Sequence, residues 1–386
     1  MKGFFNLSHL SAGFTTVLVG YTSSVVIVIQ AATASGANPA QIESWLLTLG
    51  VVMGLTSILY SWFYKTPIVT AWSTPAAVML AASAGQYSLP VVIGAFMFSG
   101  ALFTLTGMLA PLTRALSKIP VPLGTAMLGA ILLPFCAKAF TPLTDTPALF
   151  ALLFTSYLLA KHFVPRYTML VLLLVSLGSA LALGSFQHAD LALRIATPIW
   201  VTPEFDWLAM LNLALPLYLI TMLSQNLPGI AMLKSYQYDA PIKPILVGTG
   251  LATLMSAPFG GFSVNLAAIS AAICMNEDVD QDKAQRYRAV LWAGGFYLLA
   301  GIFAAAVVNL FLALPQPISA MLAGLALLGT LMMCLHTAFK TDEYREPALF
   351  TFIITLSGAT LFGMSATLIG LVVGLVYLRL SATSKK

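Results

Sequence analysis

The chain has 386 residues, of which 59% are hydrophobic and only 8% are charged, and its net charge is +5. Soluble domains carry about 25% charged residues, so these charges are too few to cover a soluble domain of this size. Apolar runs of about 20 residues, enough to span a hydrocarbon core, recur from end to end. The composition therefore indicates a multi-pass membrane protein surrounded by lipid, and the modest positive charge is not that of a nucleic-acid-binding protein.

The apolar runs predict an all-α polytopic membrane protein with about fourteen transmembrane spans. Lys2 leads into the first run without the small-residue cleavage site of a signal peptide, so we expect that run to remain as a helix. In chain order the predicted spans are 10–33, 43–63, 67–84, 89–110, 121–138, 147–161, 166–184, 206–232, 243–256, 258–275, 286–312, 316–338, 347–362 and 364–380.

The distribution of Lys and Arg supports this number of spans. With these boundaries, every basic residue except Lys138 and Arg194 falls on the same side of the membrane as the N-terminus. Cytoplasmic loops carry an excess of Lys and Arg. We therefore expect both termini to be cytoplasmic, in a protein of the cell inner membrane.

The third and tenth spans begin abnormally, at residues 66–77 and 258–268. Each opens with an extended-looking stretch that contains Pro, β-branched residues or Gly, and continues with residues typical of a helix start. Thr74, which precedes a proline, is the expected N-cap of the first helix, and Ser263 or Asn265 that of the second. The helix that remains in each is about 10 residues, too short to span.

These two stretches indicate an inverted repeat. Trp72 aligns with Phe262 and Ser73 with Ser263. Seven predicted spans precede the polar central loop and seven follow it, and an odd number makes the second half enter the membrane from the opposite side. Paired broken helices in such repeats indicate a transporter binding site. The two repeats are predicted to cover residues 1–190 and 200–386.

The pattern of charges predicts what the site can bind. Non-helical backbone survives at membrane depth only where protein or water satisfies its polar groups, so both short helices should point their N-termini into one cavity. Helix N-termini favour an anion or an acceptor-rich neutral ring. All 13 acidic residues fall in loops or at span ends. The site must therefore use dipoles and neutral polar groups, which argues against a carboxylate-based cation site.

Polar residues inside two other spans are further candidates. Gln225 and Asn226 follow a serine in the eighth span, where unpaired polar groups are costly. They are expected either to form a polar wall of the cavity or to join helices around a Pro kink. Tyr21 and Ser24 lie at a comparable depth in the first span, where helix packing explains them equally well.

Aromatic, histidine and cysteine residues complete the candidates. Trp72 and Phe262 precede the short helices, and one of them, by our expectation Phe262, could stack on a flat ligand. His336 is a proton-transfer candidate or an interfacial residue with no special role. The three scattered cysteines are expected to be buried thiols, and we expect no metal site and no cofactor. They are Cys136, Cys274 and Cys334.

At these positions the sequence resembles the benzoate/proton symporter (BenE) family. The resemblance covers essentially the whole chain, and its motifs together are fairly specific. They are TAWSTP at 70–75, SQN at 224–226 with PG at 228–229, PFGG at 258–261, and NLAAI at 265–269 continuing to AAIC at 271–274.

The resemblance implies a fold shared with nucleobase symporters and certain anion exchangers. It implies a core domain (about 10–110 and 206–312), a gate domain (about 121–184 and 316–380), a substrate site between the two short helices, movement of core against gate, and a possible homodimer. Nucleobase relatives carry acids where this chain has Gln225 and Val264. Neutral residues there suit an anionic substrate.

The leading hypothesis is therefore a proton-coupled importer of benzoate or a similar aromatic carboxylate, held by Ser73, Thr74, Ser263 and Asn265 with Phe262 on the ring. A second hypothesis keeps the fold but changes the cargo to a nucleobase, an inorganic anion or another organic acid. A third hypothesis is an intramembrane enzyme, but the spans contain no HExxH motif, acid pair or Ser-His spacing suited to catalysis.

Overall fold

The computed structural model describes residues 6–109, 111, 118–184 and 194–384 and is mostly helical. The longer helices coincide with predicted spans. They are α1 (Leu7–Ala34), α2 (Pro39–Tyr64), α4 (Leu89–Met108), α6 (Val121–Lys138), α8 (Pro147–Phe163), α9 (Thr168–Ala182), α13 (Ile242–Ser256), α15 (Tyr287–Ile302), α16 (Ala304–Leu312), α17 (Gln316–Phe339), α18 (Asp342–Ser357) and α19 (Ala366–Ser384).

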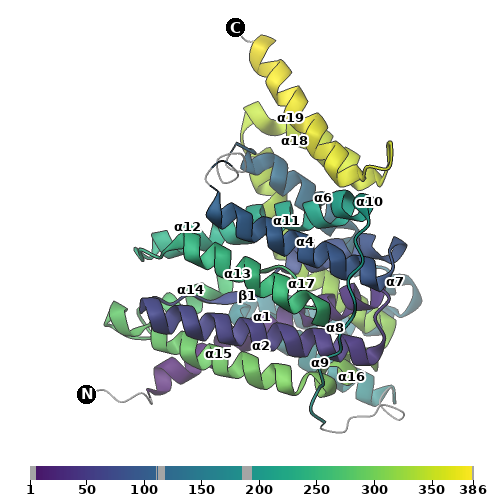
Figure 1. Cartoon of the computed structure of the whole chain (residues 1–386). Coiled ribbons are helices and arrows are strands. Elements are labelled where there is room, and N and C mark those ends of the chain that lie inside the picture. The colour runs from purple at the N-terminus through teal and green to yellow at the C-terminus, as the bar shows by residue number, and fades with distance from the viewer. Residues whose placement is uncertain (1–5, 110, 112–117, 185–193, 385–386) are drawn as a thin grey trace.

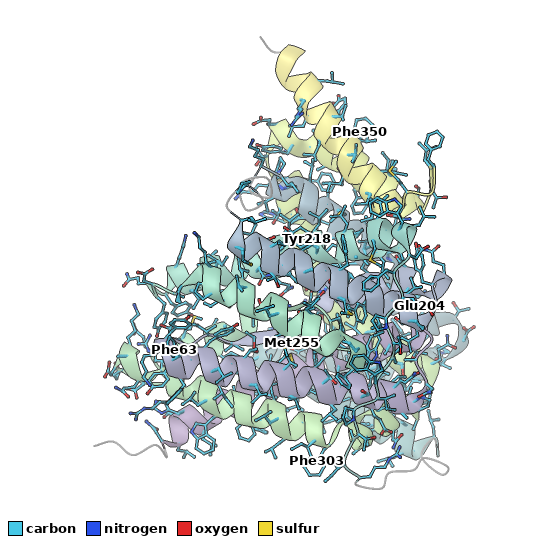
Figure 2. The ribbon with its side chains drawn as sticks, viewed as in Figure 1. Phe63, Glu204, Tyr218, Met255, Phe303 and Phe350 are labelled. Atoms are coloured by element: carbon cyan, nitrogen blue, oxygen red, sulfur yellow. The ribbon has the colours of Figure 1, made fainter. Side chains whose placement is uncertain are left out.

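The helices have the length and surface of a membrane protein. Within the described residues, eight helical segments are long and apolar enough to cross a bilayer, and a ninth is added if α15 and α16, bent by 62°, count as one. Large apolar side chains face outward, such as Phe63 at 73% exposure and Met255 at 75%. Figure 2 shows Phe63 and Phe303 at the outside of the bundle. Lipid must cover such a surface, so the protein is a polytopic helical membrane protein.

Two helix pairs pack through glycine. A Cβ on Gly50 of α2 would lie 2.6 Å from the Cα of Gly301 in α15, and one on Gly250 of α13 would lie 2.5 Å from the backbone nitrogen of Thr104 in α4. Small residues at these positions let the helix backbones approach closely. Figure 1 shows α2 along α15 and α4 along α13.

The two pairs mirror each other in chain order. Helices α2 and α4 flank strand β1 (Thr70–Trp72) in the sequence, and α13 and α15 flank strand β2 (Val264–Leu266) in the same way. Each pair joins the helix before one strand to the helix after the other strand.

The stretches expected to be extended form these two strands, which pair antiparallel with Ala71 opposite Asn265. Each is followed by a short helix, α3 (Thr74–Ser83) or α14 (Ile269–Met275). The sequence alignment placed Ala71 on Gly261, four positions before its strand counterpart. Seven residues lead from α13 to β2 but five from α2 to β1, so the longer approach accounts for two of these four positions. It contains a 3-10 turn, η5 (Ala257–Phe259), and the left-handed Gly260.

The helix caps differ from those expected from the sequence. Ser73, not Thr74, caps α3, and its Oγ accepts the N–H of Ala76 at 3.2 Å. Helix α14 begins after Ala268 without a side-chain cap. Asn265 cannot cap it because it lies in the strand.

The eighth predicted span is a continuous run of helical turns with two π-helical segments. They are η3 (Met210–Ala214) and η4 (Met222–Asn226). Pro216 and Pro228 have no N–H for the carbonyls of Asn212 and Ser224, four residues earlier, which lie in these segments. A π turn at each position is consistent with that missing hydrogen bond, and π turns are frequent at functional sites. The α-helical segments between and around them are α10 (Trp207–Ala209), α11 (Leu215–Thr221) and α12 (Leu227–Ser235).

Two adjacent glycines of α15 test the close packing. A Cβ on Gly294 would lie 2.8 Å from the backbone oxygen of Gly54, whereas a Cβ on Gly295 meets nothing within 4 Å. We expect Gly294→Ala to lower the free energy of unfolding by about 1–3 kcal/mol through overpacking. Gly295→Ala should be neutral or stabilising by up to about 1 kcal/mol, because Ala is the better helix former. Thermal unfolding in detergent measures both, and equal melting temperatures for the two variants would contradict the packing argument.

Candidate functional site

The outer edge of β2 is satisfied by side chains rather than by further strands. The Val264 N–H donates to Thr253 Oγ1 of α13 at 3.1 Å, and the Leu266 N–H donates to Asn226 Oδ1 of η4 at 3.0 Å. All of these groups are buried. Since a buried unpaired N–H is costly, these two side chains fix the position of the strand.

Helix α2 does the same for the other stretch. The Thr70 N–H donates to Ser57 Oγ and the Ile68 N–H to Ser61 Oγ, each at 3.0 Å. The Thr70 hydroxyl also contacts the hydroxyls of Thr56 and Ser57, at 2.6 and 2.9 Å. The two crossing strands are therefore held from both sides by neutral hydroxyl and amide groups.

The start of α3 presents fewer free amides than the sequence suggests. Pro75 has no N–H, and the N–H of Ala76 is taken by Ser73. Of the first three helical positions, only Thr74 keeps an N–H outside the helix and its cap. Thr74 is half-buried, and so is Ala71, which pairs with Asn265.

Tyr21, Ser24 and Trp72 form one cluster. The Trp72 indole N–H donates to Ser24 Oγ at 2.9 Å, and the Tyr21 ring meets the Trp72 ring edge-on with centroids 5.0 Å apart. The Tyr21 hydroxyl is buried without a hydrogen-bond partner in the described part of the chain. The structure thus joins candidates of the first and third predicted spans.

Ser263 and Asn265 carry buried polar atoms that lack hydrogen-bond partners among the described residues. Both lie at or next to the paired segments Thr70–Trp72 and Val264–Leu266, here called the strand crossing. Ser263 has φ +44°, a left-handed conformation that favours glycine and often marks functional sites. The Asn265 amide nitrogen donates to Ser263 O at 2.8 Å, which fixes the orientation of the amide. Ser263 Oγ and Asn265 Oδ1 are both buried and have no hydrogen-bond partner among the described residues. Val264, between them, is buried, and its backbone N–H donates to the side-chain hydroxyl of Thr253.

Phe262 and His336 lie apart from this group. Phe262 is fully buried and packs against Trp45 and Phe96, with ring centroids 5.9 and 5.5 Å away. His336 is exposed in the last turn of α17.

Gln225 is half-buried. The side-chain carbonyl of its neighbour Asn226 already accepts the N–H of Leu266 in β2. Sequence reasoning missed Thr253, which holds β2, and Thr221, whose buried hydroxyl also lacks a partner within the described ranges. A threonine in an apolar helix gives no signal that separates such roles from ordinary helix packing.

A cavity lies at some distance from this group, near the ends of several helices. It has a volume of about 540 Å³ and adjoins the start of α1, the end of α14 and the connection between α8 and α9. The three cysteines are buried free thiols. In the described part of the chain, no three His, Cys, Asp or Glu side chains gather as metal ligands.

Sequence comparison matches residues 3–380 to the family model described as BenE, benzoate membrane transport protein. The chain is 40% identical over 365 residues to the inner membrane protein YdcO of Escherichia coli K12, covering 95% of this chain and 93% of YdcO. It is 35% identical over 376 residues to the benzoate membrane transport protein of Acinetobacter baylyi, covering 97% and 95%.

Solved structures share the fold at low sequence identity. The overall structure of SLC26A9 has a TM-score of 0.67 at 13% identity, and the match covers 97% of this chain and 66% of that one. The transmembrane domain of the cyanobacterial bicarbonate transporter BicA has a TM-score of 0.62 at 16% identity, with 96% and 97% covered. These likenesses show the fold alone.

Two threonines of α13 test how β2 is held. Both are buried and donate to backbone carbonyls of their own helix, but only Thr253 accepts an N–H from β2. We expect Thr253→Val to cost about 1–3 kcal/mol because it leaves the Val264 N–H unpaired. Thr249→Val, an equally isosteric change, should cost under about 1 kcal/mol. Melting temperatures in detergent compare them, and equal losses would show that the bond to β2 contributes nothing.

Proposed function

The chain belongs to the BenE family of benzoate membrane transport proteins, and on that premise we propose that it imports benzoate or a similar aromatic carboxylate together with protons. The family consists of transporters, not enzymes. The proposed location is the cell inner membrane, as the name of its relative YdcO suggests.

The observation that carries the proposal is a group of buried, unpartnered polar atoms at the strand crossing. They are Tyr21 Oη, Ser263 Oγ and Asn265 Oδ1. Tyr21 packs on Trp72, whose register partner is Val264. Ser263 Oγ and Asn265 Oδ1 belong to the strand segment at β2. Successive strand residues point to opposite faces, so Tyr21 lies with Trp72 on the face opposite Asn265. Each such atom costs about 1–3 kcal/mol when left unpaired. A polar cargo that supplied the missing partners would remove this cost.

The chemistry of these atoms fits a carboxyl group that carries its proton. The Ser263 hydroxyl can donate to the carbonyl oxygen of the cargo, aided by the N–H of Thr74. Asn265 Oδ1 is a carbonyl oxygen and can only accept, and the bond from the amide nitrogen to Ser263 O fixes its orientation. A carboxylate has no hydrogen to donate to it, whereas a carboxylic acid has one.

This chemistry gives proton coupling without a protein proton carrier. Carboxylic acids of this class titrate near the carboxyl reference value of about 4, so an acidic exterior supplies the protonated form and a neutral cytoplasm removes its proton. One proton then enters with each cargo molecule. His336 is the alternative carrier, although its exposed place on α17 is separate from the strand crossing.

The proposed topology has fourteen spans in two inverted repeats, with the third and tenth spans broken at β1 and β2 and both termini in the cytoplasm. The mirrored packing of α2 with α15 and of α4 with α13 supports it. We assign the core domain to about 10–110 and 206–312 and the gate domain to about 121–184 and 316–380.

An inorganic anion is the second candidate cargo. The fold likeness to a bicarbonate transporter and to the anion transporter Slc26a9 favours it. A nucleobase is less suited, since Gln225 and Val264 stand where nucleobase relatives carry acids.

Uptake of radiolabelled benzoate into proteoliposomes tests the function. We expect saturable uptake that rises several-fold when the exterior is acidic, while bicarbonate and uracil compete poorly. Liposomes without protein measure passive entry of the acid. Uptake equal to that control removes the proposed substrate, and protein-dependent uptake that ignores the pH gradient removes the proposed coupling.

Two analogues test which form of the cargo binds. Benzamide is neutral and can donate a hydrogen bond to Asn265 Oδ1, whereas benzenesulfonate is a permanent anion without a donor. We expect benzamide to inhibit benzoate uptake about tenfold more strongly, the effect of losing about 1.4 kcal/mol from an unpaired acceptor. Stronger inhibition by benzenesulfonate would show that the site binds the anion.

A further inference from the structure

The cavity of about 540 Å³ lies at the far end of α14 from the strand crossing. Its walls come from the first turns of α1, the last turns of α14 and, from the proposed gate domain, Arg166 of the short turn η2 (Pro165–Tyr167). In the proposed topology this end faces the cytoplasm. Its volume falls within the range of about 300–1,000 Å³ that is usual for small-molecule sites.

Buried polar and charged side chains near the cavity are already paired. His9 Nε2 contacts Asp280 Oδ2 at 2.9 Å, which joins α1 to the loop after α14. Arg286, 6% exposed, donates from Nε to Asp280 O and from Nη1 to Met275 O, each at 2.8 Å. Arg286 therefore offsets the negative end of α14, and its guanidinium is committed to the protein backbone.

Arg166 is different, because it is the cation that lines the cavity itself. Its side chain is exposed, and its guanidinium makes no ion pair with an acid of the described chain; it lies 5.9 Å from the ring of Tyr167. Leu7 and Ile273 give the cavity apolar wall, and Asp278, from the proposed core domain, adds one acid to its lining. An arginine beside apolar wall suits a small aromatic body that carries one carboxylate.

One short helix connects this cavity to the proposed central site. Helix α14 follows β2 after two residues and has seven residues, so it is about 10 Å long. Its residues Ala272 and Ile273 line the cavity. A cargo leaving the strand crossing would pass along about 10 Å of α14 to reach the cavity.

We propose that this cavity is a second, cytoplasmic binding site for the cargo, in which Arg166 holds the carboxylate after the proton has left. The inference rests on the proposed function, because it takes its ligand from it. A guanidinium binds the carboxylate form of the cargo better than its acid form. The site therefore favours loss of the proton on the cytoplasmic side, where the proton concentration is low. Asp278 opposes binding and keeps the cargo from being retained.

Transport measured from each side tests this site. Radiolabelled benzoate uptake is compared in inside-out and right-side-out membrane vesicles. We expect Arg166→Gln to raise KM about fivefold in inside-out vesicles, the effect of losing a partly exposed charge pair, and to change KM less than twofold in right-side-out vesicles. Asp278→Asn should lower KM in inside-out vesicles, and Arg166→Lys should restore part of the loss.

Lys161→Gln is the matched control. It removes one positive charge from the last turn of α8, before the same connection, but Lys161 does not line the cavity. We expect no change in either vesicle orientation. Equal changes for Lys161→Gln and Arg166→Gln, or an Arg166→Gln effect that is the same from both sides, would overturn the second site while leaving the proposed function intact. Failure of the wild-type protein to carry benzoate in either orientation would instead overturn the proposed function.

An anionic lipid headgroup could also pair with Arg166, so binding of labelled benzoate is measured in nanodiscs of phosphatidylcholine with and without phosphatidylglycerol. We expect Arg166→Gln to weaken binding in both. A loss seen only when phosphatidylglycerol is present would assign the cavity to lipid and overturn the proposal.

Discussion

The structure depends on satisfying the backbone of two short strands inside a membrane protein. A strand pair of three residues each has outer edges, and lipid offers no hydrogen bonds to them. Ser57 of α2 serves one edge, with Ser61 holding Ile68 just before the strand, and Thr253 and Asn226 serve the other edge. All four are neutral, so the strands are fixed without placing a charge at the centre of the protein.

The same arrangement explains why the centre is suited to a transported acid. The side chains that hold the strands accept the backbone N–H groups of the strand edges. Two side-chain atoms, Ser263 Oγ and Asn265 Oδ1, remain without partners among the described residues. Neutral groups bind a cargo only weakly unless it completes their hydrogen bonds, which suits a site that must also release. Charged residues lie near the end of α14, where Arg286 is buried in the protein and Arg166 lines the cavity.

Much of the fold could be predicted because a membrane-spanning helix requires a long apolar run, which is visible in the sequence. Apolar runs marked the helices, and glycine, proline and β-branched residues marked the two extended stretches. The family resemblance at residues 70–75 and 258–274 agreed with the family match over 3–380. Helix caps were less predictable, because Ser73 and Thr74 are both good N-caps and the strand boundary chose between them.

The sequence by itself determined a polytopic helical protein with two unusual segments and no ionisable group in a span centre, because hydrophobicity and charge are local properties of the chain. Only the tertiary structure decided that Trp72 joins Tyr21 and Ser24, that Phe262 packs against Trp45 and Phe96, and that Asn226 and Thr253 hold β2. The physical reason is that partner choice depends on register and direction. A shift of four residues between the two stretches changes which side chains meet, and the alignment of the two sequence motifs does not contain that shift.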